Sequence, residues 1–428
     1  MLTLLLFAHA QAAEVSGYFR LSARPDLVGG DGRLGTSAFY GRLLNEGPWG
    51  LLDLRQPLVG DASQAGGGAP WGSLALRVEG GTVGGGDPTN GGLLGFRLSQ
   101  LYLSAGNVGF RDVTFRVGTL ETTFGDLWLF DARPTQMLVD VLGASGTWAR
   151  DGTEVMLGLG DAGWSIHGAR YHVVGSAGGS VRHRSDHVEV GLGGQAWFEP
   201  ADGDPEGPED RDARAWKVAG TVGFGDLGPV RWNRLQVVLR RRLPDAPRLT
   251  VVDGEEVRVG VSRQTDQRHE LLIGDEVELE LVPDHLEVAA AAVFEHHYDP
   301  DQLGPEGTGG ESPTNRTALS GVLRVQVALT PAFSLLGETS LAREVARGAQ
   351  GVSTDGAATD GPARKDTWQG KVGVVVSPAG PGLGARPALR ALYGAQHCSL
   401  PSAWPGAPPT GGDARWHHLV SLEAEAWF

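Results

Sequence analysis

Two carboxylates, Asp126 and Asp131, flank a short apolar run and lie near arginines in the sequence. Ionised carboxylates accept hydrogen bonds from hydroxyl groups, and guanidinium groups such as those of Arg116 and Arg133 donate them. An external loop would expose the tryptophan and phenylalanine of Leu127–Phe130, so we expect this loop to pack against an inner wall. There, both carboxylates would bind hydroxyl groups of a solute. The alternative is that they simply solvate an external loop.

Signatures of other chemistry are weak. The histidines of His296-His297 and of His417-His418 are adjacent, so each pair would split across the two faces of a strand, and we expect no zinc site. Glycine-rich stretches such as Gly84–Gly86 lack a following helix and a P-loop lysine, and no G-x-S-x-G element occurs. We therefore expect no catalytic residue, no metal, no cofactor and no enzymatic activity.

The composition narrows the fold. The chain has 428 residues, a formal net charge of −15 and 66 glycines. Each glycine inside a helix costs about 1 kcal/mol relative to alanine, which excludes an ordinary helical protein. The acidic balance argues against a nucleic-acid partner, because phosphate binding needs a basic face. Beyond the N-terminus, no apolar run approaches the roughly 20 residues of a membrane-spanning helix.

Apolar and polar residues alternate along most of the chain, with the period of a β-strand that has one apolar and one polar face. In the final segment the apolar positions are Val420, Leu422, Ala424, Ala426 and Phe428. Between them lie Ser421, Glu423, Glu425 and Trp427. The same alternation occurs in residues 187–198, 234–240, 276–281, 319–330 and 369–376. Acidic stretches rich in glycine and proline, such as Glu199–Asp212, separate these segments and are typical of solvated loops.

Two architectures suit many alternating strands, a soluble sandwich or propeller and an outer-membrane barrel, and the ends of the chain favour the barrel. Leu2–Ala8 is a short apolar run, and Ala10–Ala12 follows it with the small-x-small pattern of a signal-peptidase site. No basic residue precedes the run, so a buried first strand is the alternative. At the other end, the aromatic Phe428 ends an amphipathic strand, as in the closing strand of an outer-membrane barrel.

We therefore predict a signal peptide at residues 1–13 and a single barrel domain at residues 14–428, in the outer membrane of a Gram-negative bacterium. The expected fold is all-β, a transmembrane antiparallel β-barrel in contact with the lipid bilayer. Eighteen strands would leave about 23 residues for each strand and its connection, which is ordinary for large porins. Sixteen strands are the alternative.

The inward positions of such a barrel combine aromatic and charged side chains. If the even-numbered residues of the last strand face lipid, Trp427 faces the lumen, and the same parity turns Tyr18 and Arg20 inward in the first strand. Trp49 lies on the inward parity of the next segment. A sugar has a ring face that stacks on aromatics and hydroxyl groups that need donors and acceptors, so these residues suit sugars. The alternative is that the aromatics belong to interfacial girdles.

Five segments form an ordered set along the chain. They are Ser16–Arg20 (SGYFR), Arg42–Glu46 (RLLNE) with Trp49, Gly118–Gly143, Arg386–Arg390 (RPALR) and Glu423–Phe428 (EAEAWF). In this order they resemble maltoporin and related sugar-specific porins. The resemblance covers both ends and one early loop. It implies a homotrimer of 18-stranded barrels, in which the third extracellular loop folds inward to form the constriction.

The resemblance also implies roles for single residues on the inner wall. Tyr18, Trp49 and Trp427 fall on the family's aromatic slide, and Arg20 and Arg42 fall on its polar track.

In the inward loop, Asp126 and Asp131 match the family's constriction acids in the spacing D-x-x-x-x-D. The chain departs from the family after Asp131, where Arg133 follows in place of an aromatic-rich run. Arg133 would narrow the pore with a charge instead of a ring, so the expected solute is a saccharide that is not specified further.

The expected function is passive, saccharide-selective diffusion through the barrel. One alternative is a general or anion-preferring porin of the same fold, whose field is set by arginines. These arginines are Arg20, Arg55, Arg116, Arg133, Arg324, Arg386 and Arg390. A barrel enzyme or an adhesin is the remote alternative.

Overall fold

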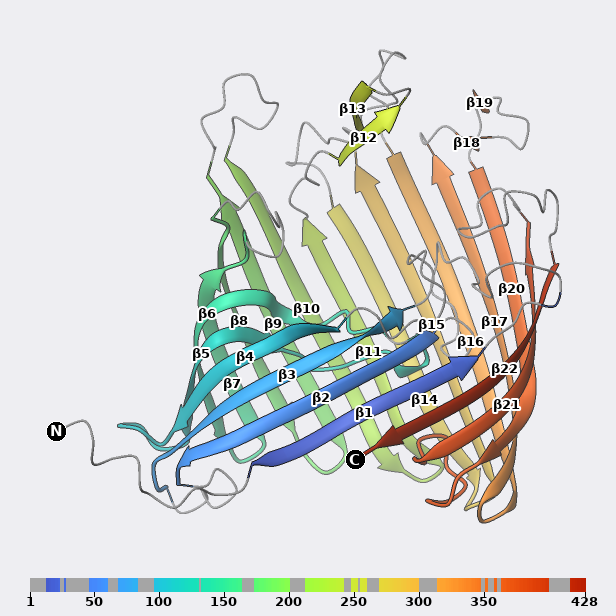
Figure 1. Ribbon diagram of the computed structural model, residues 1–428, viewed down its shortest axis with the longest axis horizontal. Helices are drawn as coiled ribbons and strands as arrows, with labels where there is room; N and C mark the ends of the chain where they lie inside the picture. The colour runs from blue at the N-terminus through green and yellow to red at the C-terminus, as the bar shows by residue number, and fades with distance from the viewer. Residues whose placement is uncertain are drawn as a thin grey trace.

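Eighteen antiparallel strands form one closed barrel in the computed structural model (Figure 1), which confirms the all-β prediction with eighteen strands instead of sixteen. The structure describes residues 13–23, 27, 46–60, 68–83, 96–130, 132–163, 173–200, 212–241, 248–252, 255–259, 269–299, 314–347, 351–352, 358–359, 363–399 and 416–428. Residues 1–12, which make up most of the predicted signal peptide, lie outside them. Among the described residues, no helix has the length and apolar character needed to cross a membrane.

The first nine barrel strands are β1 (Glu14–Ala23), β2 (Glu46–Val59), β3 (Trp71–Val83), β4 (Phe96–Gly106), β5 (Val113–Thr122), β6 (Met137–Arg150), β7 (Thr153–Asp161), β8 (Gly175–Arg184) and β9 (Val188–Glu199). The other nine are β10 (Ala213–Leu227), β11 (Val230–Arg241), β14 (His269–Val282), β15 (Leu286–Asp299), β16 (Thr314–Thr330), β17 (Phe333–Arg347), β20 (Ala363–Val376), β21 (Ala388–Cys398) and β22 (Trp416–Trp427). Two small separate sheets pair β12 (Arg248–Val252) with β13 (Glu255–Val259), and β18 (Gly351–Val352) with β19 (Ala358–Thr359).

The last strand closes the barrel against the first. Tyr18 lies opposite Trp427, and the register continues through Arg20 opposite Glu425. Beyond the end of β22, the Phe428 N–H donates to the Gly17 carbonyl over 3.0 Å, and the Gly17 N–H donates to the Phe428 carbonyl over 2.8 Å. These bonds leave no unpaired strand edge, which is the condition for a sheet inside a membrane.

Connections alternate between short and long around the barrel. Two residues separate β6 from β7, β10 from β11, and β16 from β17, whereas the connections before and after each of these hairpins are longer. In outer-membrane barrels the short turns face the periplasm and the long loops face the exterior. The ends of the strands that meet the long loops are called the long-loop end below.

The outer wall is apolar and the inner wall is polar. On β9, Val190 and Leu192 are exposed, whereas Glu189 and Gln195 of the opposite parity are buried. A soluble core would show the reverse, so the exposed apolar side chains face lipid and the alternation predicted from sequence has its apolar side outward. This architecture is that of a transmembrane β-barrel of the Gram-negative outer membrane.

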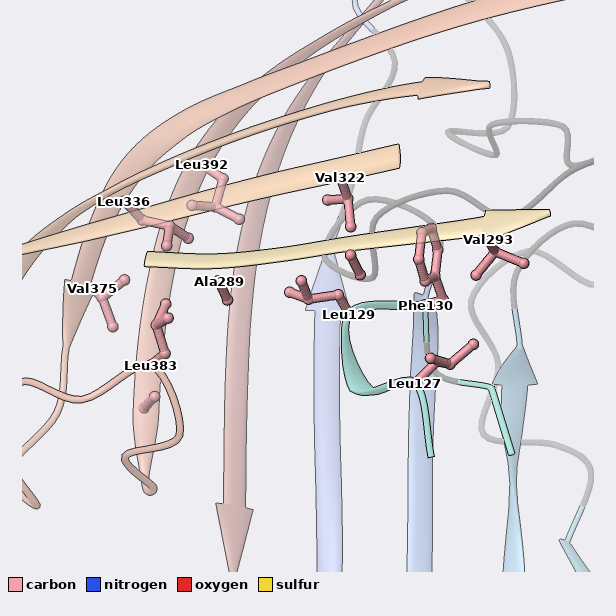
Figure 2. Packing of buried hydrophobic residues seen from close by; sticks show 12 residues of the cluster. Leu127, Leu129, Phe130, Ala289, Val293, Val322, Leu336, Val375, Leu383 and Leu392 are labelled. Carbon is pink, nitrogen blue, oxygen red and sulfur yellow. The ribbon is translucent and has the colours of Figure 1, made fainter. Parts of the chain in front are cut away.

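The connection between β5 and β6 folds into the barrel and packs against the far wall. Its short 3₁₀ helix η2 (Trp128–Phe130) carries Leu129 and Phe130 into an apolar cluster with inward side chains of β15, β16, β17, β20 and β21 (Figure 2). Leu127 and Leu129 are fully buried. The inward-folded loop expected from its apolar run is therefore confirmed.

Candidate functional site

An aromatic pair lies on the inner wall where the barrel closes. The ring centroids of Tyr18 and Trp427 are 4.4 Å apart, with an angle of 40° between the ring planes. Trp427 is 63% exposed, whereas Tyr18 is only 6% exposed. Both side chains lie on the same face of the sheet as the buried Glu425, so both face inward, as predicted from the sequence. Trp427 thus offers an open aromatic surface, and Tyr18 lies behind it.

Two further predicted residues lie on this part of the wall. Arg20 is buried and donates through Nη1 to the Tyr18 hydroxyl over 3.3 Å. Trp49 of β2 is half-buried and lies opposite Arg20 in the register of β1 and β2. The three strands β22, β1 and β2 therefore bring Trp427, Tyr18, Arg20 and Trp49 onto one strip of the inner wall, called the aromatic strip below.

Charged groups of β21 and β22 border the aromatic strip. The Tyr18 hydroxyl donates to Glu425 Oε1 over 2.9 Å, and Arg390 Nη2 donates to Glu425 Oε2 over 2.7 Å. Arg386 Nε lies 2.8 Å from the same oxygen. The site prediction omitted Glu425, although the period of two in the last strand places it on the same face as Trp427.

The inward loop brings Asp126 to the opposite part of the wall. Its carboxylate Oδ1 accepts a hydrogen bond from Arg234 Nη1 of β11 over 2.9 Å, and its backbone carbonyl accepts one from Gln236 over 2.8 Å. Gly125 allows this close approach, since a Cβ there would lie 3.0 Å from Gln236 Nε2 and 3.2 Å from Arg234 Cδ. The carboxylate remains about half exposed, so one of its sides faces open space within the barrel.

The other loop and constriction residues are more scattered. Arg133 is exposed. Arg116 places its guanidinium carbon 4.0 Å from the centre of the Tyr102 ring and donates to the Glu121 carbonyl over 3.4 Å. Asp131 and Arg42 lie outside the described residues. The structure therefore forms an aromatic strip and a separate Asp126 contact, and it does not gather all predicted site residues into one cluster.

A buried ionic cluster lies beneath the inward loop. Arg324 Nε donates to Glu338 Oε2 over 2.5 Å, and Lys371 Nζ lies 2.7 Å from Glu338 Oε1. All three side chains are almost completely buried. The Arg324 guanidinium carbon lies 4.9 Å from the centre of the Trp128 ring of η2. Arg324 is one of the pore arginines predicted from sequence, whereas its two partners lie on other strands and no local pattern identifies them.

The loop is anchored by a second buried carboxylate. The Leu129 N–H donates to Glu276 Oε2 of β14 over 2.9 Å, and Glu276 is fully buried. This bond satisfies a backbone donor that the loop would otherwise bury without a partner. In the described part of the chain, no group of three or more histidine, cysteine, aspartate or glutamate side chains could hold a metal ion.

No protein-family model matches the chain, and no curated protein is similar to it in sequence. Among solved structures, the chain is similar to OccAB1 of Acinetobacter baumannii, with 11% identity, a TM-score of 0.48, and 97% of this chain and 96% of that chain covered. The outer membrane channel DcaP of the same organism has 11% identity and a TM-score of 0.46, with 97% of both chains covered. OccK3 (OpdO) of Pseudomonas aeruginosa has 12% identity and a TM-score of 0.45, with 97% and 95% covered. These similarities are too low to transfer a function, and the strands and walls described above by themselves define a porin-type β-barrel.

Proposed function

We propose that this chain is an outer-membrane channel for the passive diffusion of saccharides. The observation that carries the proposal is the exposed ring of Trp427 on the inner wall, beside Glu425 and the guanidinium of Arg390 that donates to it. A sugar ring stacks its apolar face on an indole, while its hydroxyl groups exchange hydrogen bonds with carboxylates and guanidiniums. In this proposal Trp427 and Trp49 are the stacking surfaces, and Tyr18 holds Trp427 in place from behind.

The polar part of the proposed route runs along the charged groups. Arg20 lies within the aromatic strip and Arg390 borders it, and Asp126 would accept hydrogen bonds from hydroxyl groups where the inward loop meets β11. Arg116 and Arg133 supply donors on the loop side, and Asp131 and Arg42 keep the roles that the resemblance implies. Together these residues would exchange hydrogen bonds with a sugar as it passes.

The alternative, an anion-preferring or general channel, depends on arginines that dominate the field of the lumen. Four of its named arginines are paired with carboxylates: Arg55 with Glu14, Arg324 with Glu338, Arg386 with Glu425, and Arg390 with Glu425 and Glu423. A paired carboxylate weakens the field of its arginine at the distance of a passing ion. Arg133 makes no ion pair with any described residue and is the strongest reason to keep this alternative.

Bilayer recordings with purified protein test the proposal. We expect neutral oligosaccharides to block the ion current transiently, and Trp427→Ala to weaken the block about 2- to 10-fold, because an aromatic contact contributes roughly 0.5–1.5 kcal/mol. Ion conductance should stay unchanged or rise slightly. Trp148→Ala is the matched control, since Trp148 is exposed on the outer wall. An equal block in Trp427→Ala would remove Trp427 from the site, and strong anion preference without any block would favour the alternative.

We also propose that the barrel is a homotrimer, as the resemblance implies. Asp275 is exposed on the outer wall at the middle of β14 and accepts a hydrogen bond from Asn233 Nδ2 of β11 over 3.0 Å. A carboxylate at the centre of a lipid-facing surface is costly, so contact with a second copy would stabilise it. Light scattering of the detergent-solubilised protein should give the mass of three chains, and the mass of one chain would contradict the trimer.

A further inference from the structure

The outer wall contains a hollow near its long-loop end, with a volume of about 540 Å³. It spans β15, β16, β17, β20 and β21. One row of residues across these strands lines the hollow, each residue opposite the next in the strand register: Ala292, Gly321, Leu341, Trp368 and His397. The hollow opens toward lipid, because Leu341 and Trp368 belong to the exposed apolar set of the outer wall.

Small residues form the floor of this hollow, and Trp368 forms one side. Ala292 and Gly321 carry little or no side chain, and Gly321 lies between Leu319 and Leu323 on the outer face of β16, which leaves space there. The Trp368 indole lies over Gly370, since a Cβ there would be 2.7 Å from the ring, and its Nε1 donates to Thr339 Oγ1 over 3.1 Å. A second hollow of about 420 Å³, over Gly337 and Gly370, lies on the other side of the indole.

The rim of the first hollow is basic. Arg343 Nε donates to Asp366 Oδ1 over 2.7 Å, and Arg364 Nε donates to Asp366 Oδ2 over 2.8 Å. Two guanidiniums therefore share one carboxylate, which leaves a formal charge of +1. Both arginine side chains are more than half exposed, and each guanidinium has five N–H donors, so both can donate further hydrogen bonds.

We propose that this hollow binds a phosphate-bearing lipid of the outer leaflet. The phosphate would lie on Arg343 and Arg364 at the rim, and one saturated acyl chain would lie in the apolar hollow beside Trp368. Three observations favour a lipid: the hollow faces the bilayer, its rim lies toward the long-loop end where the exterior headgroup region begins, and its walls are apolar. Guanidiniums bind phosphate through paired charge-assisted hydrogen bonds, which neutral lipids cannot form.

The test measures lipid retention by native mass spectrometry after the purified barrel is stripped with detergent. Dipalmitoyl phosphatidic acid and dipalmitoylglycerol carry the same chains and differ in the phosphate. We expect the barrel to retain phosphatidic acid about tenfold better, and the double variant Arg343→Gln/Arg364→Gln to lose this preference. Heat-modified gel mobility checks that each variant folds.

A matched pair of glycine variants separates this hollow from its neighbour. A Cβ at Gly321 meets only the Ala291 carbonyl, at 3.8 Å, and a Cβ at Gly337 meets nothing within 4 Å, so the first side-chain atom fits at both positions. The rest of a leucine side chain would extend into the hollow beside each glycine. Gly321→Leu fills the proposed hollow and should abolish retention of phosphatidic acid. Gly337→Leu fills the second hollow and should leave retention unchanged.

Three results would overturn the proposal. The first is equal retention of the two lipids by the unaltered protein. The second is displacement of phosphatidic acid by millimolar inorganic phosphate, which would mean that the hollow contributes nothing to binding. The third is dissociation of an oligomer by Gly321→Leu with lipid retention unchanged, which would assign the hollow to a contact between copies. None of these results depends on whether the channel conducts sugars.

Discussion

Two regions of the inner wall both carry inward-facing side chains, but one region is buried and the other is exposed. On β16, β17 and β20, the inward Arg324, Glu338 and Lys371 are packed beneath the inward loop as tightly as a protein core. On β22, the inward Trp427 presents most of its ring to open space. The contrast shows that strand alternation decides which side chains face inward, whereas tertiary contacts, here those of the loop from β5 to β6, decide which of them are covered.

The largest expected effect is a loss of stability when the buried ionic cluster is disrupted. Glu338→Ala leaves Arg324 and Lys371 buried without their shared carboxylate, and removal of one partner of a buried ionic group costs about 3–5 kcal/mol. Urea unfolding in lipid vesicles, followed by tryptophan fluorescence, measures this loss. Arg150→Ala, which breaks the exposed pair with Asp151, is the control and should cost less than about 1 kcal/mol. Similar losses in the two variants would mean that the covered cluster is not packed as described.

The second prediction concerns the inward loop that covers the buried ionic cluster. Leu129→Ala truncates a fully buried side chain of η2, and such truncations cost about 2–5 kcal/mol. Here the loss would weaken the packing of the loop against the barrel wall. The loop should become sensitive to protease, and single-channel conductance should rise. Leu157→Ala on the lipid-facing wall is the control. If conductance and protease resistance both stay at the level of the unaltered protein, the loop does not limit the passage.

The smallest expected effect on stability comes from the partly exposed pair of Asp126 and Arg234, at the edge of the inward loop. Asp126→Asn removes one charge from a partly exposed pair with Arg234, so stability should change by less than about 1 kcal/mol. The ion preference of the channel should shift toward anions, because Arg234 loses its neutralising partner. Reversal potentials in a salt gradient measure the shift. An unchanged reversal potential would place Asp126 away from the ion path.

The last strand illustrates how far sequence reasoning could reach. Its period of two predicted that Trp427 faces inward while Leu422 faces lipid, and the observed pairing with β1 agrees. The apolar run between Asp126 and Asp131 correctly predicted a packed loop. The roles of Tyr18, Trp49, Trp427 and the charged residues in binding a solute remain predictions.

The sequence did not reveal which strands the loop would meet. Leu129 bonds to Glu276, and Trp128 contacts Arg324, across sequence separations that no local pattern encodes. For the same reason the burial of Tyr18 behind Trp427 could not be foreseen, since it depends on closure of the barrel by strands at opposite ends of the chain.

The amino-acid sequence by itself determined the strands, their inward and outward faces and the packed character of one loop, because each follows from neighbours within about ten residues. Only the tertiary structure decided which inward groups are covered, which are paired and which remain open to a solute. Closing the barrel places residues hundreds of positions apart, such as Tyr18 and Glu425, within hydrogen-bonding distance, and such contacts set the charge and access of the described groups beside them.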